Sequence, residues 1–197
     1  MSLIEVTEES LFSGLEEEIF MGLTYKNLDA DTRRLMLAEI DRDLSEGLLY
    51  LSDNLNPQGQ QIYPELIKAA ARDGSDVTLA AVVRGWLNAH EKPRKLKSGG
   101  FSKPPVMRVN AHEMLAEGEF NRFYIRAICL RAIQQGVPEV VVYRAKIAEH
   151  ARAESEQKIG QRISAEALLR DLRAHTGIDT ALSLPPGPNS GLSVHLP

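Results

Sequence analysis

The sequence predicts a mainly α-helical protein, either nearly all-α or α+β with a few short strands, built as two small helical units joined by a basic connector. Several segments carry apolar residues at helical spacing, only one run is strongly β-branched, and a cationic stretch rich in Gly and Pro separates the halves. The 197 residues can bury a core without disulfides. We divide the chain into an acidic helical arm (1–23), an N-terminal helical unit (24–90), the connector (91–105), a C-terminal helix and strand unit (106–180) and an extended Pro/Gly-rich tail (181–197).

In the N-terminal half, helix signals follow one another closely. Thr7 is a candidate N-cap for a first helix, and a second helix is expected from Asp29 or Asp31 to a stop at Gly47. Residues 48–51 are expected to be extended. Pro64 suits the first position of the next helix, which would run to Gly74. A further helix, capped by Ser75, carries a wide apolar stripe, so these helices are expected to pack together.

The connector contains three prolines and two adjacent glycines, so no long regular element is expected through it. After it, Val106–Val109 is a candidate strand. A long helix, with a bend possible at Gly118, is expected to end at Gly136. Apolar side chains surround this helix almost completely, which is typical of a central helix.

Beyond the central helix, residues 139–144 hold three consecutive valines and a tyrosine and form the best strand candidate of the chain. A charged helix is expected around 153–159, and a last helix is expected from Ser164 to Gly177. The tail after residue 180 is expected to be extended or irregular.

Charge is distributed unevenly along the chain, although the formal net charge is only -4. Residues 1–31 hold eight acidic side chains and a single lysine, Lys26, a net charge of −7. Residues 91–105 hold five cationic side chains and one acid, Glu91, a net charge of +4. One chain therefore carries an acidic arm and a basic arm.

Two cationic groups are candidate contact sites for a partner protein or a nucleic acid. In the connector, Phe101 interrupts a run of cations, and basic arms of this kind neutralise phosphates. On the central helix and after the strand, arginines suit phosphate or carboxylate groups. Glu119 lies on the same helix face as two of these arginines, so internal ion pairs are an open alternative. The candidates are Lys92, Arg94, Lys95, Lys97, Phe101, Lys103, Arg122, Arg126, Arg144 and Lys146.

No cofactor or metal site is expected, because the five histidines are scattered and none has a partner at metal-ligand spacing. Glu139 with Lys146 is too loosely spaced to indicate a nuclease, and no nucleophile elbow or phosphate-binding loop is present. Cys129, the single cysteine, lies in an apolar run and is expected to be a buried, inert thiol. We therefore expect a protein that is not an enzyme.

The first residues are acidic where a secretory signal would be basic, and no apolar run approaches the length of a membrane span. We expect a cytoplasmic protein without membrane contact.

Three stretches, AEGEFNRFYIRAICLRAI, VVVYRAK and LPPGPNSGLSV, resemble proteins of unassigned function from bacteria and their prophages. The resemblance covers most of residues 24–197. It implies a phage or mobile-element setting in the cytoplasm of a bacterial host or within a virion, and it supplies no activity and no site residues.

Together these features favour an assembly protein, such as a capsid- or neck-associated virion subunit, that contacts copies of itself or other structural proteins through its arms. The alternative is a nucleic-acid-binding accessory protein that uses the connector and the arginines of the central helix.

Overall fold

The computed structural model describes residues 22–146, 153–176 and 191–197. The described chain is mainly helical and carries one small antiparallel sheet, which confirms the predicted fold class. The helix expected after Thr7 lies outside the described residues. No helix within the described ranges is both long and apolar enough to cross a bilayer.

Helix α1 (Ala30–Ser45) begins and ends as the sequence predicts. The side chain of Asp29 accepts a hydrogen bond from the backbone N–H of Thr32 (3.0 Å) and so caps the first turn. Met36 and Ile40 are fully buried on its inner face. The helix therefore covers the core with a narrow apolar stripe, as its spacing indicates.

Helix α2 (Pro57–Asp73) begins seven residues earlier than the sequence predicts. Asn56 is the N-cap, and its side chain accepts a hydrogen bond from Gly59 N–H (2.7 Å), while Pro57 takes the first position. Pro64, the expected start, lies inside the helix and leaves the carbonyl of Gln60 without its usual donor. The helix tolerates this proline because Tyr63 and Ile67 anchor it in the core.

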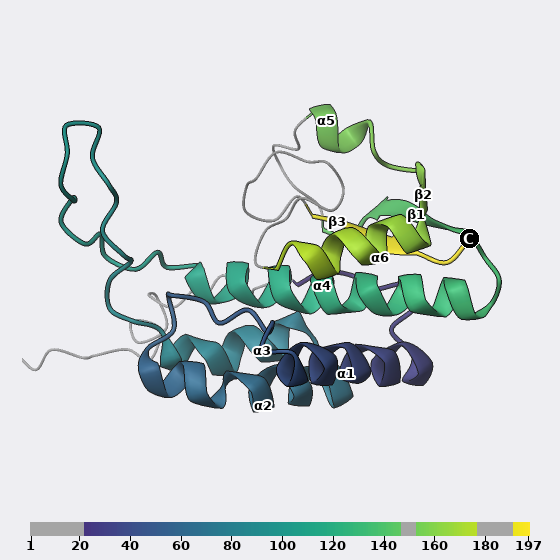
Figure 1. The fold of residues 1–197 in the computed structure, drawn as a ribbon, viewed down its shortest axis with the longest axis horizontal. Helices are drawn as coiled ribbons and strands as arrows, with labels where there is room; N and C mark the ends of the chain where they lie inside the picture. The colour runs from purple at the N-terminus through teal and green to yellow at the C-terminus, as the bar shows by residue number, and fades with distance from the viewer. Residues whose placement is uncertain (1–21, 147–152, 177–190) are drawn as a thin grey trace, which may run out of the picture.

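Helix α4 (Ala111–Gln134) is the centre of the molecule. Figure 1 shows α1, α2 and α3 (Asp76–Val83) on one side of α4, and the sheet with α6 (Ala165–Ala174) on the other. One hydrophobic core joins side chains from all of these elements. The 24–90 and 106–180 segments thus share one hydrophobic core. The connector separates them in the sequence, but they do not form two separate cores.

The sheet has the order β2-β1-β3, and both pairings are antiparallel. Its central strand β1 (Glu139–Arg144) was predicted. Neither edge strand was: β2 (Arg162–Ser164) precedes α6, and β3 (Leu192–His195) lies in the Pro/Gly-rich tail. Val194 pairs with Val142 and is fully buried, so the end of the tail belongs to the core.

The short connections complete the described fold. Residues 84–86 form a 3-10 turn after α3, and α5 (Ala153–Glu156) is shorter than the helix expected there. Residues 48–51 are irregular. The strand expected at Val106–Val109 reduces to a single bridge between Val106 and His90, at the base of the connector.

Candidate functional site

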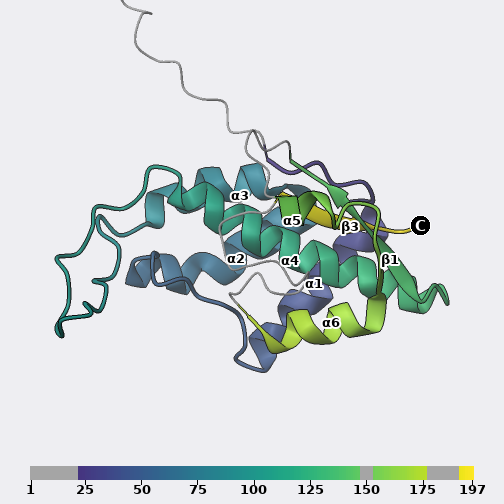
Figure 2. The same ribbon diagram turned by 90° about the horizontal axis from the view of Figure 1, so that it is seen from above.

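The connector forms a hairpin that projects from the helical body. We use the name hairpin for residues 90–106. Bridges pair His90 with Val106 at its base and Lys95 with Phe101 near its tip. Figures 1 and 2 show it extending past the ends of the helices in two perpendicular views. The expected break in regular structure is thus a two-stranded arm.

The backbone of the hairpin explains why this composition forms an arm. Ser102 N–H donates to the carbonyl of Arg94 (2.8 Å), and Leu96 N–H donates to that of Gly100 (3.1 Å). Gly99 and Gly100 close the tip with φ of 89° and 77°, a region that glycine occupies without steric cost. The prolines between base and tip have no N–H, which limits the pairing to these two short patches.

Exposed apolar side chains gather on the hairpin and just beyond it. Phe101 is 70% exposed, Val106 is 74% exposed, and Val109, two residues before α4, is 90% exposed. Leu96 at the tip is 44% exposed. Exposed apolar groups that cluster on a protruding element mark a contact surface more often than scattered ones do.

The cations of the hairpin fall into two groups. At its base, Lys92 pairs with Asp53 (2.6 Å), and Glu91 pairs with Arg108 (2.5 Å) and with Arg94 (3.6 Å). The hydrogen bond from Arg108 lowers the pKa of Glu91. Lys95 and Lys97 near the tip, and Lys103 on the second strand, are exposed and make no ion pair with any described residue. These three lysines are available to a partner.

The strand pairing places an aromatic ring and a lysine on one face of the hairpin. Lys95 and Phe101 are cross-strand neighbours, and side chains of such a pair project from the same face. Lys103, two residues after Phe101 in an extended segment, is expected on that face too. The face therefore combines positive charge with an exposed ring.

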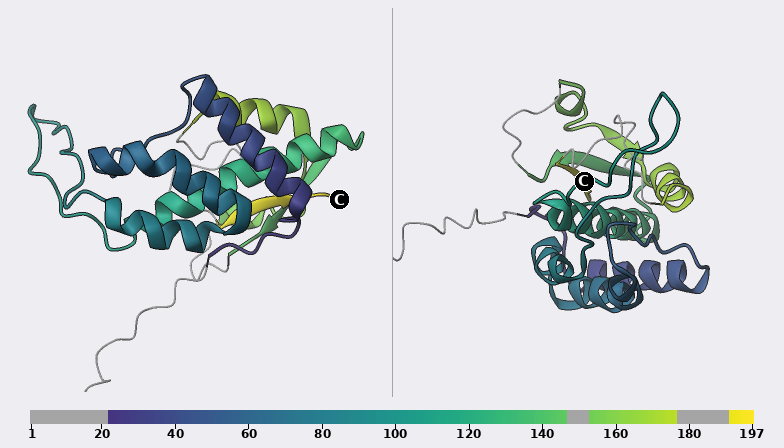
Figure 3. Two further views of the ribbon diagram at one scale, coloured as in Figure 1. Left: turned by 90° about the horizontal axis from the view of Figure 1, so that it is seen from below. Right: turned by 90° about the vertical axis from the view of Figure 1, so that its left-hand side faces the viewer.

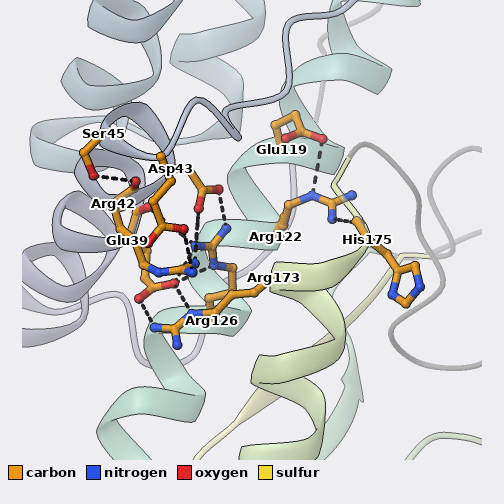
Figure 4. Close-up of polar contacts among 10 residues, drawn as sticks. Glu39, Arg42, Asp43, Ser45, Glu119, Arg122, Arg126, Arg173 and His175 are labelled. Atoms are coloured by element: carbon orange, nitrogen blue, oxygen red, sulfur yellow. Dashed lines mark hydrogen bonds and ion pairs between the residues drawn. The ribbon is translucent and has the colours of Figure 1, made fainter.

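Arg126 lies inside the molecule, away from the hairpin. Its Nε donates to Glu39 (2.7 Å), and its two terminal nitrogens donate to the oxygens of Asp43 (2.6 and 2.8 Å). Arg173 of α6 also pairs with Glu39, so the cluster ties α4 to α1 and α6 (Figure 4). The right-hand view of Figure 3 shows α1 and α6 on different sides of α4, so the arginine side chains reach between the helices. Arg126 is thus paired with both carboxylates and Glu39 with both arginines, and the cluster is an internal brace.

The buried carboxylates and arginines of this cluster stabilise one another's charged forms. Burial would raise the pKa of Glu39, but the hydrogen bond from Arg173 and the charge of Arg126 outweigh burial and hold that pKa below its usual value. The carboxylates of Asp43 and Glu39 in turn raise the pKa of Arg126 against the effect of its own burial. The arginine therefore stays charged within the core.

Arg122 pairs with Glu119 (3.4 Å), as the internal alternative expected, and also donates to the backbone carbonyl of His175 (2.6 Å) (Figure 4). Burial raises the pKa of Glu119. The ion-pair partners of Arg126 are on α1, so only Arg122 uses Glu119 directly. Neither arginine lies with the exposed lysines of the hairpin.

The two basic residues after β1 are also paired. Arg144 donates to Glu156 (2.6 Å), and Lys146 pairs with Glu117 of α4. Glu117 is 2% exposed, and burial raises its pKa. The structure thus places the ten sequence candidates in separate places: six on the hairpin, two within α4 and two at the end of β1.

Sequence reasoning missed two sets of residues. Leu96, Val106 and Val109 add apolar surface to the hairpin, and their apolar character next to prolines and lysines was a readable signal. Glu39, Asp43 and Arg173 had no such signal, because each is 83 to 134 residues from the group that it pairs with.

A metal or thiol site finds no support in the described ranges. No group of three or more His, Cys, Asp or Glu side chains there is placed to hold a metal ion. Cys129 is buried, and burial raises the pKa of its thiol to about 12, so it is protonated at neutral pH.

Comparison of the chain with protein-family models, with curated proteins and with solved structures finds no match.

Proposed function

We propose that the protein is a non-enzymatic assembly component that contacts neighbouring subunits through the hairpin. Four exposed apolar side chains on and beside this projecting element carry the proposal: Leu96, Phe101, Val106 and Val109. The resemblance noted in the sequence favours a virion or prophage particle as the assembly, formed in the cytoplasm of a bacterial host.

The energetics of the hairpin support a docking role. Burial of an exposed aromatic or aliphatic side chain against a partner contributes roughly 1–2 kcal/mol. Four such side chains along the hairpin and just beyond its base supply apolar contact area, and the exposed lysines between them supply polar contacts. The fold holds these side chains away from its own core, where a neighbouring molecule reaches them without rearrangement of the body (Figure 2).

The test is the molar mass of the native chain by light scattering at micromolar concentration, alone and after co-purification from its host. We expect a mass above the 21.8 kDa of a single chain, or a co-purified structural protein. The double substitution Phe101→Ser with Val106→Ser abolishes that association. The matched control is Val82→Ser with Ile62→Ser, at positions exposed on α3 and α2, and it leaves the association intact.

A wild-type chain that is monomeric at every salt concentration and brings down no protein contradicts the proposal. Equal loss of association in the control pair contradicts it as well, because the contact would then lie elsewhere.

A second candidate function is binding of single-stranded nucleic acid, favoured by the shared face of Lys95 and Phe101. Bases stack on exposed aromatic rings, and neighbouring lysines neutralise phosphates. Binding to a labelled single-stranded oligonucleotide at low salt should then weaken at least about tenfold when Lys95, Lys97 and Lys103 become Ala. The matched control, Arg34→Ala with Arg72→Ala and Lys158→Ala, removes the same charge from the body. Equal affinities for the two triple variants contradict this function.

A further inference from the structure

We propose that the hairpin binds the acidic N-terminal segment, residues 5–18, of a second copy of this chain. This inference rests on the proposed assembly function and names the partner surface. It is carried by the charges that the described structure leaves uncompensated, and by the matching composition of the two segments.

The ion pairs of the described residues show which cations of the hairpin are left for a partner. Lys92 and Arg94 pair with acids of their own chain, at Asp53 and Glu91. The unpaired positive charge of the hairpin is therefore concentrated at its tip and on its second strand, in Lys95, Lys97 and Lys103.

The same comparison selects the acidic residues proposed to bind the hairpin. Asp29 caps α1 and pairs with Arg131 (2.6 Å), and Asp31 pairs with Arg34 (3.5 Å). The other acids of residues 1–31 are all earlier in the sequence: Glu5, Glu8, Glu9, Glu16, Glu17 and Glu18. Residues 1–25 contain no lysine or arginine, so this stretch needs cations from elsewhere.

Apolar composition matches as well as charge. The acidic stretch includes Leu11, Phe12 and Leu15 among its glutamates, and the hairpin sets Leu96 and Phe101 among its lysines. A contact between them buries apolar groups at its centre and pairs opposite charges at its edge. That is the usual arrangement of a specific protein interface.

Residues 23 and 24, which follow the acidic segment in the sequence, are held at a fixed place on the body. Leu23 N–H donates to Asp76 at the start of α3 (2.7 Å), and Thr24 N–H donates to the carbonyl of Ala145 (2.8 Å). The hairpin leaves the body after the other end of α3. Exchange between two copies makes the same contact twice about a two-fold axis, which is the commonest way that chains form closed oligomers.

Charge-reversed chains test the proposal. In one variant Lys95, Lys97 and Lys103 become Glu, and in the other Glu16, Glu17 and Glu18 become Lys. Each variant alone carries like charges at the three hairpin lysine positions and at residues 16–18, and its self-association is expected to fall at least about tenfold, because exposed opposite charges become like charges. An equimolar mixture pairs opposite charges in both contacts and recovers wild-type association to within about threefold.

Light scattering and sedimentation of the full-length chains at low salt give the readout, and circular dichroism checks that each variant keeps the wild-type fold. The control Arg34→Glu with Arg72→Glu and Lys158→Glu reverses the same charge on the body and is expected to associate as the wild type does.

Each other outcome overturns the inference in a recognisable way. If the wild type associates and only the hairpin variant fails to, the hairpin binds another surface, and the assembly function survives. If the mixture of variants stays monomeric, the acidic stretch is not the partner. A monomeric wild type contradicts the contact between copies, and one that also brings down no other protein removes the assembly function too. Nucleic acid that co-purifies with the wild type and not with the hairpin variant identifies the other class of partner.

Discussion

For Arg126, spacing along the sequence predicts an ion pair correctly but gives the wrong partner. Its helix predicted an ion pair with Glu119, seven residues away, but the partners are Glu39 and Asp43 of α1. No local pattern links residues more than 80 positions apart. The burial of α4 on all sides, which the sequence did predict, is what brings these carboxylates to the guanidinium.

Replacement of Arg126 by Met is expected to lower the free energy of unfolding by about 3–5 kcal/mol, because the buried carboxylates of Glu39 and Asp43 lose the cation that they share. Urea denaturation measures the change. Arg34→Met is the matched control, since Arg34 and Asp31 are each 67% exposed, and we expect a change below about 0.5 kcal/mol there. A cost under about 1 kcal/mol for Arg126→Met would show that the cluster does not brace the fold.

Asp76 is expected to make stability depend on pH. Burial raises its pKa, and the residue is fully buried at the start of α3 with Glu117 and Lys146 near it. The folded protein therefore binds this proton more tightly than the unfolded chain does. The resulting penalty is present above the folded pKa and is relieved as the pH falls through it.

The difference in unfolding free energy between the wild type and Asp76→Asn should therefore shift in favour of the wild type as the pH is lowered from 7 towards 4. Urea midpoints at several pH values measure it. Asp73→Asn, at an exposed position, controls for removal of one charge. A difference that does not vary with pH, or that varies in the opposite direction, contradicts the assignment.

At the scale of elements, helices were predicted better than strands. The limits of α1 follow from Asp29 and from an apolar stripe, and β1 follows from consecutive valines, so each is encoded within its own segment. The edge strands β2 and β3 are short and exist through pairing with β1, which no local pattern reports. The early start of α2 was missed because Pro57 and Pro64 offer the same signal, and the cap at Asn56 decides between them.

The strand in the tail supplies a test at this scale. Val194→Ala is expected to cost about 1–3 kcal/mol of unfolding free energy, because the residue is fully buried opposite Val142. Val109→Ala removes the same methyl groups from a side chain that is 90% exposed, and the expected change is below about 0.5 kcal/mol. Thermal or urea denaturation distinguishes the two. Equal costs would mean that the tail does not pack as β3.

For the molecule as a whole, the position of the basic connector follows from the sequence, whereas the single core shared by the two halves is seen only in the fold. The basic connector and its Phe101 could be recognised from composition, because charge and exposure usually go together. Which lysines stay unpaired depended on Asp53 and Glu91, and only the fold shows this. The two halves share a core because α4 contacts α1 and α3 across the connector.

The hairpin is thus attached to a single folded body and lies outside its core. Its residues contribute nothing to the buried core, so its replacement by a tight turn between residues 91 and 105 should leave the unfolding free energy within about 0.5 kcal/mol of the wild type. Folding and association can therefore be separated in one variant.

The most direct measurement is the molar mass, by light scattering at matched micromolar concentration, of the full-length chain and of this hairpin-shortened form. The account predicts a wild-type mass that is a multiple of 21.8 kDa and falls as salt is added, and a folded monomer for the shortened form. Equal masses for the two chains, whether both monomeric or both associated, would contradict a contact made by the hairpin.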